Sequence, residues 1–500
     1  MALVSEVVVP VESVDPSSMA QDEFTYIDIG AIDSAAGRVA KPKRIAVSDA
    51  PSRARQAVRQ GDVLFSTVRP YLRAIALTPP LTAAVASTAF CVLRAATGID
   101  PRFLCYWVRS EAFIAQVLPL QRGSSYPAVR DQDVLDRSIP VPPSAQQRVI
   151  ADRLDELFSE LDTAVAELQS AQAKLIQYRQ SLLKAAVQGD LTAEWRAENP
   201  PQETGAELLV RILSERRAHW EARQLERHAT QGKSPPKDWQ ASYLEPAAAN
   251  ETCLPRLPLG WTWTTIDQLS PDDLANGRSV PTSDSGAKVL RLTAVRKGGI
   301  DLSEYKHGAW TVEEAAPFCV QHNDLLVVRG NGSLSLVGRA GLVPAVGEPV
   351  AFPDTLIRLR TLAAVVRPAW LAALWDSART RDHLEGRART SAGIYKISQP
   401  DILSLTVAVP PLDEQDAALV VLFAETEQLN ALSLAIEQGL KMAAAQRQNI
   451  LRAAFTGQLV PQDPNDEPAS ALLVRIHAER RQATDKPTCR APRRAKAATA

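Results

Sequence analysis

Apolar residues recur every seven positions along two long stretches of the chain. In the first stretch the repeating residues are Leu154, Leu161, Leu168, Leu175 and Leu182. In the second they are Leu422, Leu429, Ile436, Ala443 and Ile450. A sustained seven-residue apolar repeat is typical of helices that pack as a coiled coil. Both stretches are therefore predicted to be long helices.

Start and stop signals bound each predicted helix. Pro-Pro pairs stand at 142–143 and 410–411, and Gly189 and Gly457 follow the apolar runs. Proline breaks a strand ladder, and glycine just after an apolar run marks a helix C-terminus. About 42 residues at about 1.5 Å each make a rod of roughly 60 Å. A single run could be a core helix of a bundle, but two copies favour a pair packed on each other.

The two predicted helices belong to an internal repeat. IPVPPSAQQRVIADRLDELFSEL (139–161) aligns with VAVPPLDEQDAALVVLFAETEQL (407–429), and QSLLKAAVQGDL (180–191) aligns with QNILRAAFTGQL (448–459), both at an offset of 268. Further on, ELLVRILSERR (207–217) recurs as ALLVRIHAERR (471–481), at an offset of 264. Three matches in the same order indicate a duplication, and repeats of this kind decide the architecture.

A region of mixed character precedes each predicted helix. Short apolar runs bounded by turn residues predict strands at DVLFSTV (62–68), ASTAFCVLRA (86–95), DLLVVRG (324–330) and DTLIRLR (354–360). YWVRSEAFIAQVL (106–118) and AWLAALWDSARTRDHLEGR (369–387) predict helices. The fold class is therefore α+β, with two mixed α/β globular domains alternating with two long helices. We expect these helices to form an intramolecular antiparallel coiled coil with a pseudo-twofold repeat.

The same patterns give boundaries along the chain. The first globular domain takes residues 1–143, a helical region 144–225, a polar linker 226–256, the second globular domain 257–411, a second helical region 412–482, and a disordered basic tail 483–500. The second domain opens with LPLGWTWTTIDQL (257–269). The first has no such opening, and we expect its first strands near FTYIDIGAID (24–33).

Composition narrows the class of protein. The five cysteines are far apart and form no CxxC pair, so we expect neither a disulfide scaffold nor a zinc site. This use of cysteine favours the reducing environment of the cytoplasm. The sequence has no run of about 18 apolar residues, so no membrane span is predicted. The net charge of −1 is weak evidence against a DNA-binding protein that works alone. Basic residues nevertheless outnumber acidic ones strongly between residues 33 and 73.

Motifs for catalysis are weak. NPPQ (199–202) resembles the catalytic motif of adenine methyltransferases but lacks the aromatic residue that would stack on a flipped base. RGNGSLS (329–335) lacks the Lys-Ser/Thr pair of a phosphate loop, and the six histidines show no metal-ligand spacing. We therefore expect no catalytic residue, no metal and no cofactor bound by this chain.

The order of globular domain, long helix, globular domain and long helix resembles the specificity subunit of type I restriction-modification systems. Each helix begins with PP-x3-Q and ends with Q-x2-L-x-A-A-x2-G-x-L. The resemblance implies that the globular domains are target recognition domains and that the helices are spacers between them. It also implies assembly with two modification subunits, which bind S-adenosylmethionine and methylate adenine, and with restriction subunits that translocate and cut DNA.

The function implied is recognition of a bipartite, gapped DNA sequence, with one half-site for each domain and no reaction of the chain's own. Two alternatives stay open, a non-catalytic coiled-coil scaffold and the specificity part of a single-chain restriction enzyme-methyltransferase. Arginine, asparagine and glutamine commonly contact bases, while lysine and serine more often hold phosphates. The candidate DNA-binding residues are Lys41, Lys43, Arg44, Arg69, Tyr71, Arg73, Arg122, Ser124 and Tyr126 in the first domain, and Arg329, Asn331, Ser333, Arg339, Arg387, Arg389, Tyr395 and Lys396 in the second.

Overall fold

The chain folds into two compact units. The computed structural model describes residues 1–252, 254–296, 298–391 and 393–484. Unit 1 comprises residues 1–171 and 435–500, and unit 2 comprises residues 172–434. Residues 485–500 of the expected tail, together with Cys253 and Cys489, lie outside the described residues. Because each boundary falls inside a long helix, each unit holds one globular domain and part of both helices.

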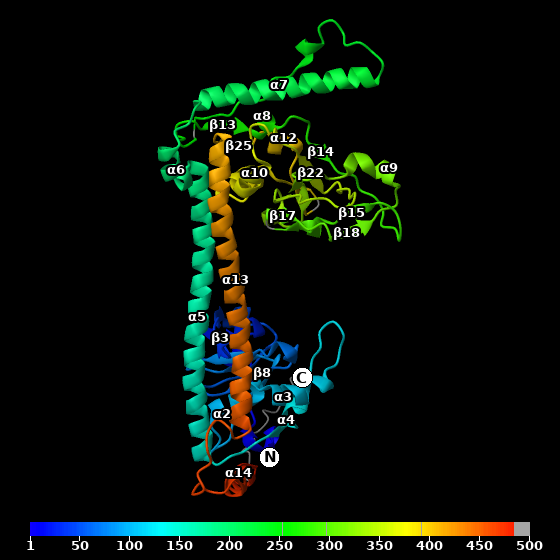
Figure 1. The fold of residues 1–500 in the computed structure, drawn as a ribbon. Coiled ribbons are helices and arrows are strands. Elements are labelled where there is room, and N and C mark those ends of the chain that lie inside the picture. The colour runs from blue at the N-terminus through cyan, green and yellow to red at the C-terminus, as the bar shows by residue number, and fades with distance from the viewer. Residues whose placement is uncertain (253, 297, 392, 485–500) are drawn as a thin grey trace. The chain divides into compact units, whose positions relative to one another are not determined.

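The two long helices are present as the apolar repeat predicted (Figure 1). Helix α5 spans Ser144–Gln188 and helix α13 spans Leu412–Phe455. Both end at a glycine in the left-handed region, Gly189 with φ 76° and Gly457 with φ 77°. Glycine takes this conformation without the clash of a Cβ atom. The duplicated glycines therefore explain why both helices stop at equivalent positions.

Within each unit the two helices run antiparallel, and one polar contact between them is repeated in both units. In unit 1, Arg447 pairs with Asp162 and lies 4.7 Å from the ring of Phe158. In unit 2, Arg179 donates to Asn430 Oδ1 at 2.7 Å. Arg179 and Arg447 are 268 residues apart, as are Asp162 and Asn430. One interhelical contact is thus made twice, with the helices exchanging roles.

The seven-residue seam is most deeply buried where the helices meet the globular domains. Leu154 is buried in unit 1, and Leu182, Leu422 and Leu429 are buried in unit 2. The remaining seam leucines of α5, which are Leu161, Leu168 and Leu175, are half-buried. Ile436 is buried and Ile450 is half-buried. The seam is thus an extension of the domain cores.

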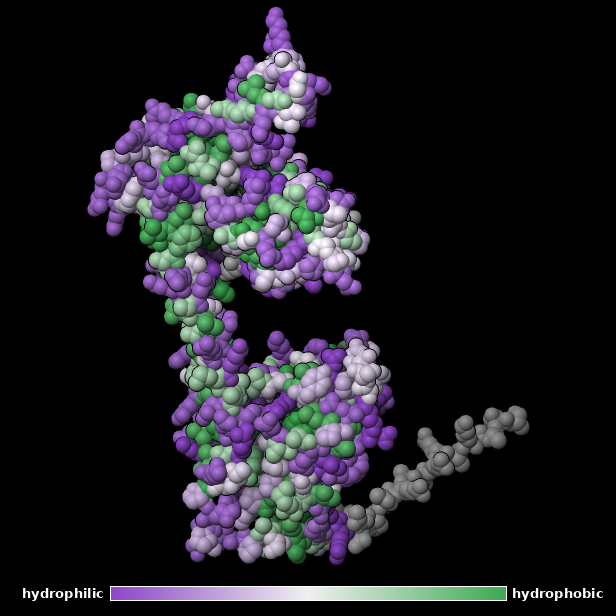
Figure 2. Space-filling view, turned by 45° about the vertical axis from the view of Figure 1, so that its right-hand side comes forward, coloured by the Kyte–Doolittle hydropathy of each residue, from purple (hydrophilic) through white to green (hydrophobic). Residues whose placement is uncertain are grey.

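Helix α13 also contains a stretch that is long and apolar enough to cross a membrane by length and composition alone. The sequence analysis expected no such stretch. Apolar surface lies along the helices of unit 2 (Figure 2), and the exposed residues there include Ile176, Val420 and Phe423. Helices that pack inside soluble proteins meet the same criterion, and α13 packs on α5 within each unit. This single helix is therefore weak evidence for a membrane span.

Unit 1 contains two main sheets. A six-stranded sheet has the order β2 (Val8–Val9), β11 (Phe90–Ala95), β8 (Val63–Ser66), β9 (Ile75–Leu77), β5 (Arg38–Val39) and β4 (Ile32–Asp33). A four-stranded sheet has the order β6 (Lys43–Ala46), β3 (Glu23–Ile27), β10 (Ala84–Ser87) and β7 (Ala54–Ala57). Helices α2 (Pro101–Arg109) and α3 (Glu111–Val117) contribute to the same core as the start of α5 and the end of α13.

Unit 2 repeats the six-stranded sheet. Its order is β14 (Ala275–Asn276), β22 (Leu356–Leu359), β19 (Leu325–Val328), β21 (Ala340–Leu342), β17 (Gly298–Ile300) and β16 (Val295–Arg296). The single parallel pair of each sheet occupies the same place, β5 with β9 and β17 with β21. Smaller sheets join β15 (Lys288–Leu290) to β18 (Tyr305–His307), and β20 (Gly330–Asn331) to β24 (Ile394–Lys396) and β23 (Arg389–Ser391).

A buried ion pair marks the same corner of both six-stranded sheets. Asp62 accepts from the N–H of Arg59 at 2.8 Å and pairs with Arg94 at 2.7 Å. Asp324 accepts from the N–H of Gln321 at 2.8 Å and pairs with Arg360 at 2.7 Å. Each aspartate is 2% exposed, so a lost partner would leave a buried charge unpaired. The duplication therefore extends to buried charges.

Two predicted helices are each divided in the structure. The stretch 106–118 is split between α2 and α3, and 369–387 between α10 (Pro368–Leu374) and α11 (Ala378–Arg387). Ser110 Oγ accepts from the N–H of Phe113, and Ser377 Oγ from that of Thr380. A serine that caps a new helix in this way competes with continuation of the preceding one. The predicted strand 86–95 is likewise divided, between β10 and β11.

The expectation that the first strands of the first domain lie near residues 24–33 is wrong, because β1 (Ala2–Leu3) and β2 precede them. Strand β1 pairs with β12 (Ser138–Ile139), as β13 (Thr262–Thr265) pairs with β25 (Thr406–Val409). The short helix α1 (Val4–Val7) packs on α14 (Ala469–Thr484), as α8 (Ile266–Leu269) packs on α7 (Gly205–Thr230). Residues 2–7 are therefore the counterpart in unit 1 of TWTTIDQL (262–269) in unit 2, although they contain no tryptophan. Helix α7 continues to Thr230, past the expected boundary at 225.

The two helix-ending glycines give a matched pair of substitutions. A Cβ atom at Gly189 would lie 2.5 Å from Pro258 Cγ and 3.2 Å from Trp261, whereas one at Gly457 meets nothing within 4 Å. We expect Gly457→Ala to destabilise unit 1 by about 1–2 kcal/mol, through the left-handed backbone alone. Gly189→Ala should destabilise unit 2 by more, and calorimetric unfolding would measure both. Equal losses would contradict the packing described around Gly189.

Candidate nucleic-acid interface

In unit 1 the turn after strand β8 joins a loop that precedes α4 (Asp131–Leu135). Isolated bridges connect Ala128 to both Val68 and Arg122, and the N–H of Arg69 donates to Pro127 O at 2.7 Å. The turn at 67–73 and the loop at 122–128 therefore form one surface. This surface, the unit 1 loop pair, contains six of the nine candidates in the first domain: Arg69, Tyr71, Arg73, Arg122, Ser124 and Tyr126.

Arg69 is the centre of the unit 1 loop pair. Its guanidinium lies 5.0 Å from the ring centre of Tyr126, and Nη2 donates to Ser125 O at 3.3 Å. The Nε atom is buried and has no hydrogen-bond partner among the described residues. Tyr126 is 73% exposed, so the arginine lies on an aromatic ring that faces solvent. A guanidinium held by an aromatic ring and a backbone carbonyl can still donate from its planar group to a base edge or a phosphate.

The backbone of the turn is also unusual. Arg69 has φ 50° and Arg73 has φ 51°, both in the left-handed region that favours glycine. Between them, Pro70–Leu72 form a short 3-10 helix, and Tyr71 is 46% exposed. Non-glycine residues keep such a conformation only where their surroundings hold them there, and functional sites are common places for it.

Arg122 is held by a carboxylate. It pairs with Asp133 at 2.9 Å, and Asp133 also accepts from the N–H of Arg130 at 2.8 Å. The backbone N–H of Arg130, followed by Arg122, lowers the pKa of Asp133 below its ordinary value. Asp133 therefore stays ionised and fixes the loop at neutral pH. Ser124, at the tip of the loop, is exposed.

The other three candidates of the first domain lie apart from the loop pair. Lys43 and Arg44 are on β6 in the four-stranded sheet, and Lys41 precedes that strand. Lys43 pairs with Asp28 at 2.8 Å and Arg44 with Glu23 at 3.2 Å. No hydrogen bond or ion pair between described residues joins them to Arg69. They form a second basic group whose charge is partly balanced.

In unit 2 a three-stranded sheet gathers candidates that are far apart in sequence. Asn331 on β20 is opposite Tyr395 on β24, and Arg389 on β23 is opposite Lys396 on β24. Lys396 is exposed, and Asn331 Oδ1 accepts from the N–H of Ser333 at 3.0 Å. This small sheet follows β19 as the unit 1 loop pair follows β8. The two units thus place a basic and aromatic surface at equivalent points.

The remaining candidates of unit 2 are occupied by local contacts. Arg329 Nη1 donates to Asp354 O at 3.5 Å, and Arg339 Nε donates to Ser335 O at 2.9 Å. Arg387 lies 3.3 Å from a ring nitrogen of His383. Arg329 directly precedes β20, and among the residues that the structure describes no hydrogen bond or ion pair joins Arg339 or Arg387 to the small sheet.

The structure also reveals basic residues that the sequence analysis missed. In β18, Lys306 is opposite Val289 on β15, as Lys43 on β6 is opposite Tyr26 on β3. The neighbouring Lys288 nitrogen lies 4.7 Å from the ring centre of Tyr305. Only strand register shows the correspondence, because the two segments have diverged in sequence. Lys306 is therefore the counterpart of Lys43 in unit 2.

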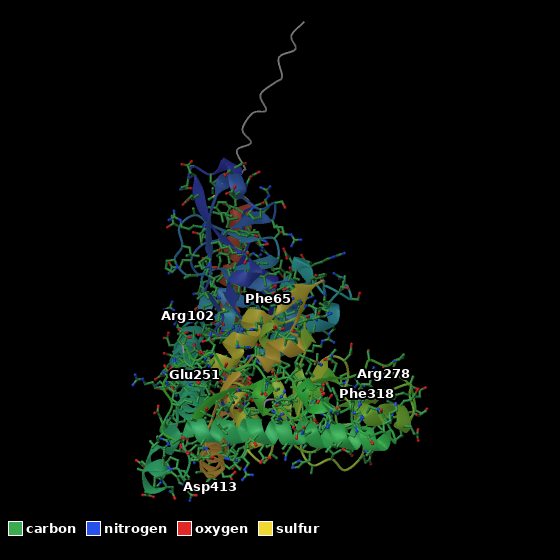
Figure 3. The ribbon with its side chains drawn as sticks, turned by 90° about the horizontal axis from the view of Figure 1, so that it is seen from above. Phe65, Arg102, Glu251, Arg278, Phe318 and Asp413 are labelled. Carbon is green, nitrogen blue, oxygen red and sulfur yellow. The ribbon has the colours of Figure 1, made fainter. Side chains whose placement is uncertain are left out.

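A small aromatic cluster, Trp310 and Phe318, supports that region. The rings of Trp310 and Phe318 stack with centres 5.8 Å apart, and Arg278 lies 6.0 Å from the ring of Trp310. Figure 3 labels Arg278 and Phe318 close together at one end of unit 2. The cluster fixes the β15–β18 sheet without reaching the small sheet of Asn331 and Tyr395 by any described contact.

NPPQ, one of the motifs weighed for catalysis, makes a local contact at the end of a short helix. The Asn199 amide of NPPQ donates to Trp195 O at 2.8 Å, at the end of α6 (Ala193–Glu198). Burial raises the pKa of the Cys105 thiol to about 11, which leaves it protonated and a poor nucleophile. Among the described residues, no group of three or more His, Cys, Asp or Glu could hold a metal ion.

Comparison with known proteins identifies similar chains. The family model described as the type I restriction modification DNA specificity domain matches residues 58–170. The EcoKI specificity subunit of Escherichia coli (strain K12) is 28% identical over 409 residues, covering 78% of this chain and 75% of that protein. The StySPI specificity subunit of Salmonella potsdam is 26% identical, covering 80% and 77%.

The fold is shared with a solved structure. A chain from work on complex assembly and conformational transition of the type I R-M system is 25% identical, with a TM-score of 0.63. The match covers 91% of this chain and 97% of that one. The similarity therefore includes both globular domains and both long helices.

The carboxylate of Asp133 should control the order of the unit 1 loop pair. Its pKa is lowered in the fold, so its stabilising effect is present above the ordinary value of 3.8 and is lost as pH falls through the lowered value. We expect Asp133→Asn to weaken the hold on Arg122 at neutral pH and to speed amide hydrogen exchange across residues 122–133. The matched control is Asp136→Asn, which should leave that exchange unchanged. Equal exchange in all three proteins would contradict the role of Asp133.

Proposed function

The chain belongs to the family of type I restriction-modification DNA specificity subunits, and from that premise we propose that it recognises a bipartite, gapped DNA sequence. Each unit would recognise one half-site through its own surface, the loop pair in unit 1 and the small sheet in unit 2. The observation that carries this proposal is the occurrence of a basic and aromatic surface once per unit, after equivalent strands β8 and β19.

Two separate surfaces suit this task. A single small domain contacts only a few base pairs, so two half-sites together give a far rarer target. Because the copies are joined in one chain, their surfaces can diverge and the half-sites need not be symmetric. Arg69 and Asn331 illustrate the divergence, since both lie just beyond equivalent strands. Arginine commonly pairs with guanine and asparagine with adenine, so the two half-sites should differ.

Partners would supply the chemistry. The chain would act with two modification subunits, which bind S-adenosylmethionine and methylate adenine, and with restriction subunits that translocate and cut double-stranded DNA. The chain itself would bind no cofactor and would catalyse no step, and the complex would work in the cytoplasm. Partner subunits could also contribute phosphate contacts, which would account for a net charge of only −1.

Exchange of one recognition domain should change one half of the target. We expect replacement of residues 1–140 by the corresponding segment of another family member to alter a single half-site. The measurement is a genome-wide map of methylated adenines in cells with the original and the exchanged gene. A change in both halves would contradict the assignment of one half-site to each unit.

Single substitutions should separate the two surfaces. Arg69→Gly keeps the left-handed backbone and removes the guanidinium, and Asn331→Ala removes an amide from the small sheet. Each should reduce discrimination at one half-site roughly 10- to 100-fold, because a specific base contact contributes about 1–3 kcal/mol. Methylation of a library with each half-site varied measures the effect. The charge-matched control is Arg59→Gly, which removes an exposed arginine outside the loop pair. If Arg69→Gly and Asn331→Ala relaxed recognition of the same half-site, the proposal would be refuted.

A further inference from the structure

A completely buried glutamine joins the long helix to the globular domain in each unit. Gln147 on α5 and Gln415 on α13 are both 0% exposed. They are the glutamines of the duplicated PP-x3-Q pattern and lie 268 residues apart. Buried amides are uncommon unless all their hydrogen bonds are made, so the partners of these two side chains show what they hold together.

The two glutamines make the same contacts in separate units. Gln147 Oε1 accepts from the N–H of Asp100 at 2.9 Å, and Nε2 donates to Pro142 O at 2.8 Å. Gln415 Oε1 accepts from the N–H of Arg367 at 2.7 Å, and Nε2 donates to Pro410 O at 2.8 Å. Nε2 of Gln415 also donates to Val365 O at 3.1 Å.

The partners lie at the junction of domain and helix. Asp100 and Arg367 are the N-cap residues of α2 and α10, which belong to the globular domains. Pro142 and Pro410 are in the segments that lead from the last strand into the long helices. Each glutamine therefore connects three elements at once: the long helix, the segment before it, and the start of a domain helix, α2 in unit 1 or α10 in unit 2.

Charged residues reinforce each junction in a different way. In unit 1, Arg102 pairs with Asp152 and Asp155 of α5, both at 2.7 Å. In unit 2, Arg367 pairs with Asp416 of α13 at 2.6 Å. These ion pairs are partly exposed and differ between the units, whereas the buried glutamine contacts are the same. The contact retained in both copies of the repeat is therefore that of the buried glutamine side chain.

We propose that Gln147 and Gln415 are positioning residues, each fixing the angle at which a recognition domain leaves its long helix and so setting the gap between the half-sites. The inference rests on the proposed function, because a gap exists only if two half-sites are recognised. A side chain that contacts no DNA would then determine which spacing is accepted, while the bases recognised in each half-site depend on other residues.

The test uses the whole chain assembled with its methylating partner. The substrates are duplexes that carry the mapped half-sites at the native gap and at gaps one base pair shorter and longer. We expect Gln147→Met and Gln415→Met to raise methylation at the altered gaps at least about tenfold relative to the native gap. Preference for each half-site base should stay as in the original protein. The double variant should combine the two effects, because independent sites are additive.

Two further variants keep the test decisive. Gln428→Met replaces an exposed glutamine on α13 and should leave the gap preference unchanged. Gln147→Asn and Gln415→Asn keep a neutral amide but shorten the side chain by one methylene, so the amide no longer reaches both of its partners. They serve if the methionine variants do not fold, and they should relax the gap preference in the same direction.

The outcomes separate the inference from the proposed function. If the variants lower methylation equally at every gap, the glutamines only stabilise the fold and the inference is refuted. If the original protein already accepts all gaps equally, or directs no methylation at a two-part site, the proposed function fails first. Relaxed gaps with unchanged bases would support both.

Discussion

In each unit the apolar core continues from the globular domain into both long helices. The core of unit 1 contains Leu154 and Phe158 of α5 together with Leu451 and Ala454 of α13. The core of unit 2 contains Leu182 of α5 and Leu422 of α13, among others. A recognition domain cannot turn about its helices without exposing this apolar surface, and about 25 cal/mol is lost for every Å² exposed. The attachment of each domain to its helices depends on this shared core.

Polar groups that are buried have kept their contacts through the duplication. The Asp62–Arg94 and Asp324–Arg360 pairs lie at equivalent corners, and the two glutamines at the helix starts have the same hydrogen bonds. A buried donor or acceptor that loses its partner costs about 1–3 kcal/mol, so such positions change least. Exposed positions carry no such penalty, and the loops that differ between the units are the ones proposed to contact DNA.

The unit 1 loop pair combines strain with exposure. Arg69 and Arg73 have left-handed backbones, and Arg69 lies on the ring of the exposed Tyr126. β-Bridges from Ala128 to Val68 and to Arg122 hold the turn. These bridges are made within the protein and do not depend on a ligand. If Arg69 contacts DNA as proposed, an arginine already held in one orientation would lose less entropy on binding.

The sequence by itself determined the two long helices, their ends and the duplication, because a seven-residue repeat, prolines and glycines act through local geometry. It also determined central strands of both six-stranded sheets, β8 and β11 in unit 1 and β19 and β22 in unit 2, since apolar runs bounded by turns need no distant partner to be recognised. Only the tertiary structure decided which candidates come together. Arg69 meets Tyr126 and Asn331 meets Tyr395 through strand and loop pairing across more than fifty residues, which no local pattern encodes. It likewise showed residues 2–7 as the start of the first domain and Lys306 as the counterpart of Lys43, because register is fixed by pairing between strands and survives where sequence similarity does not.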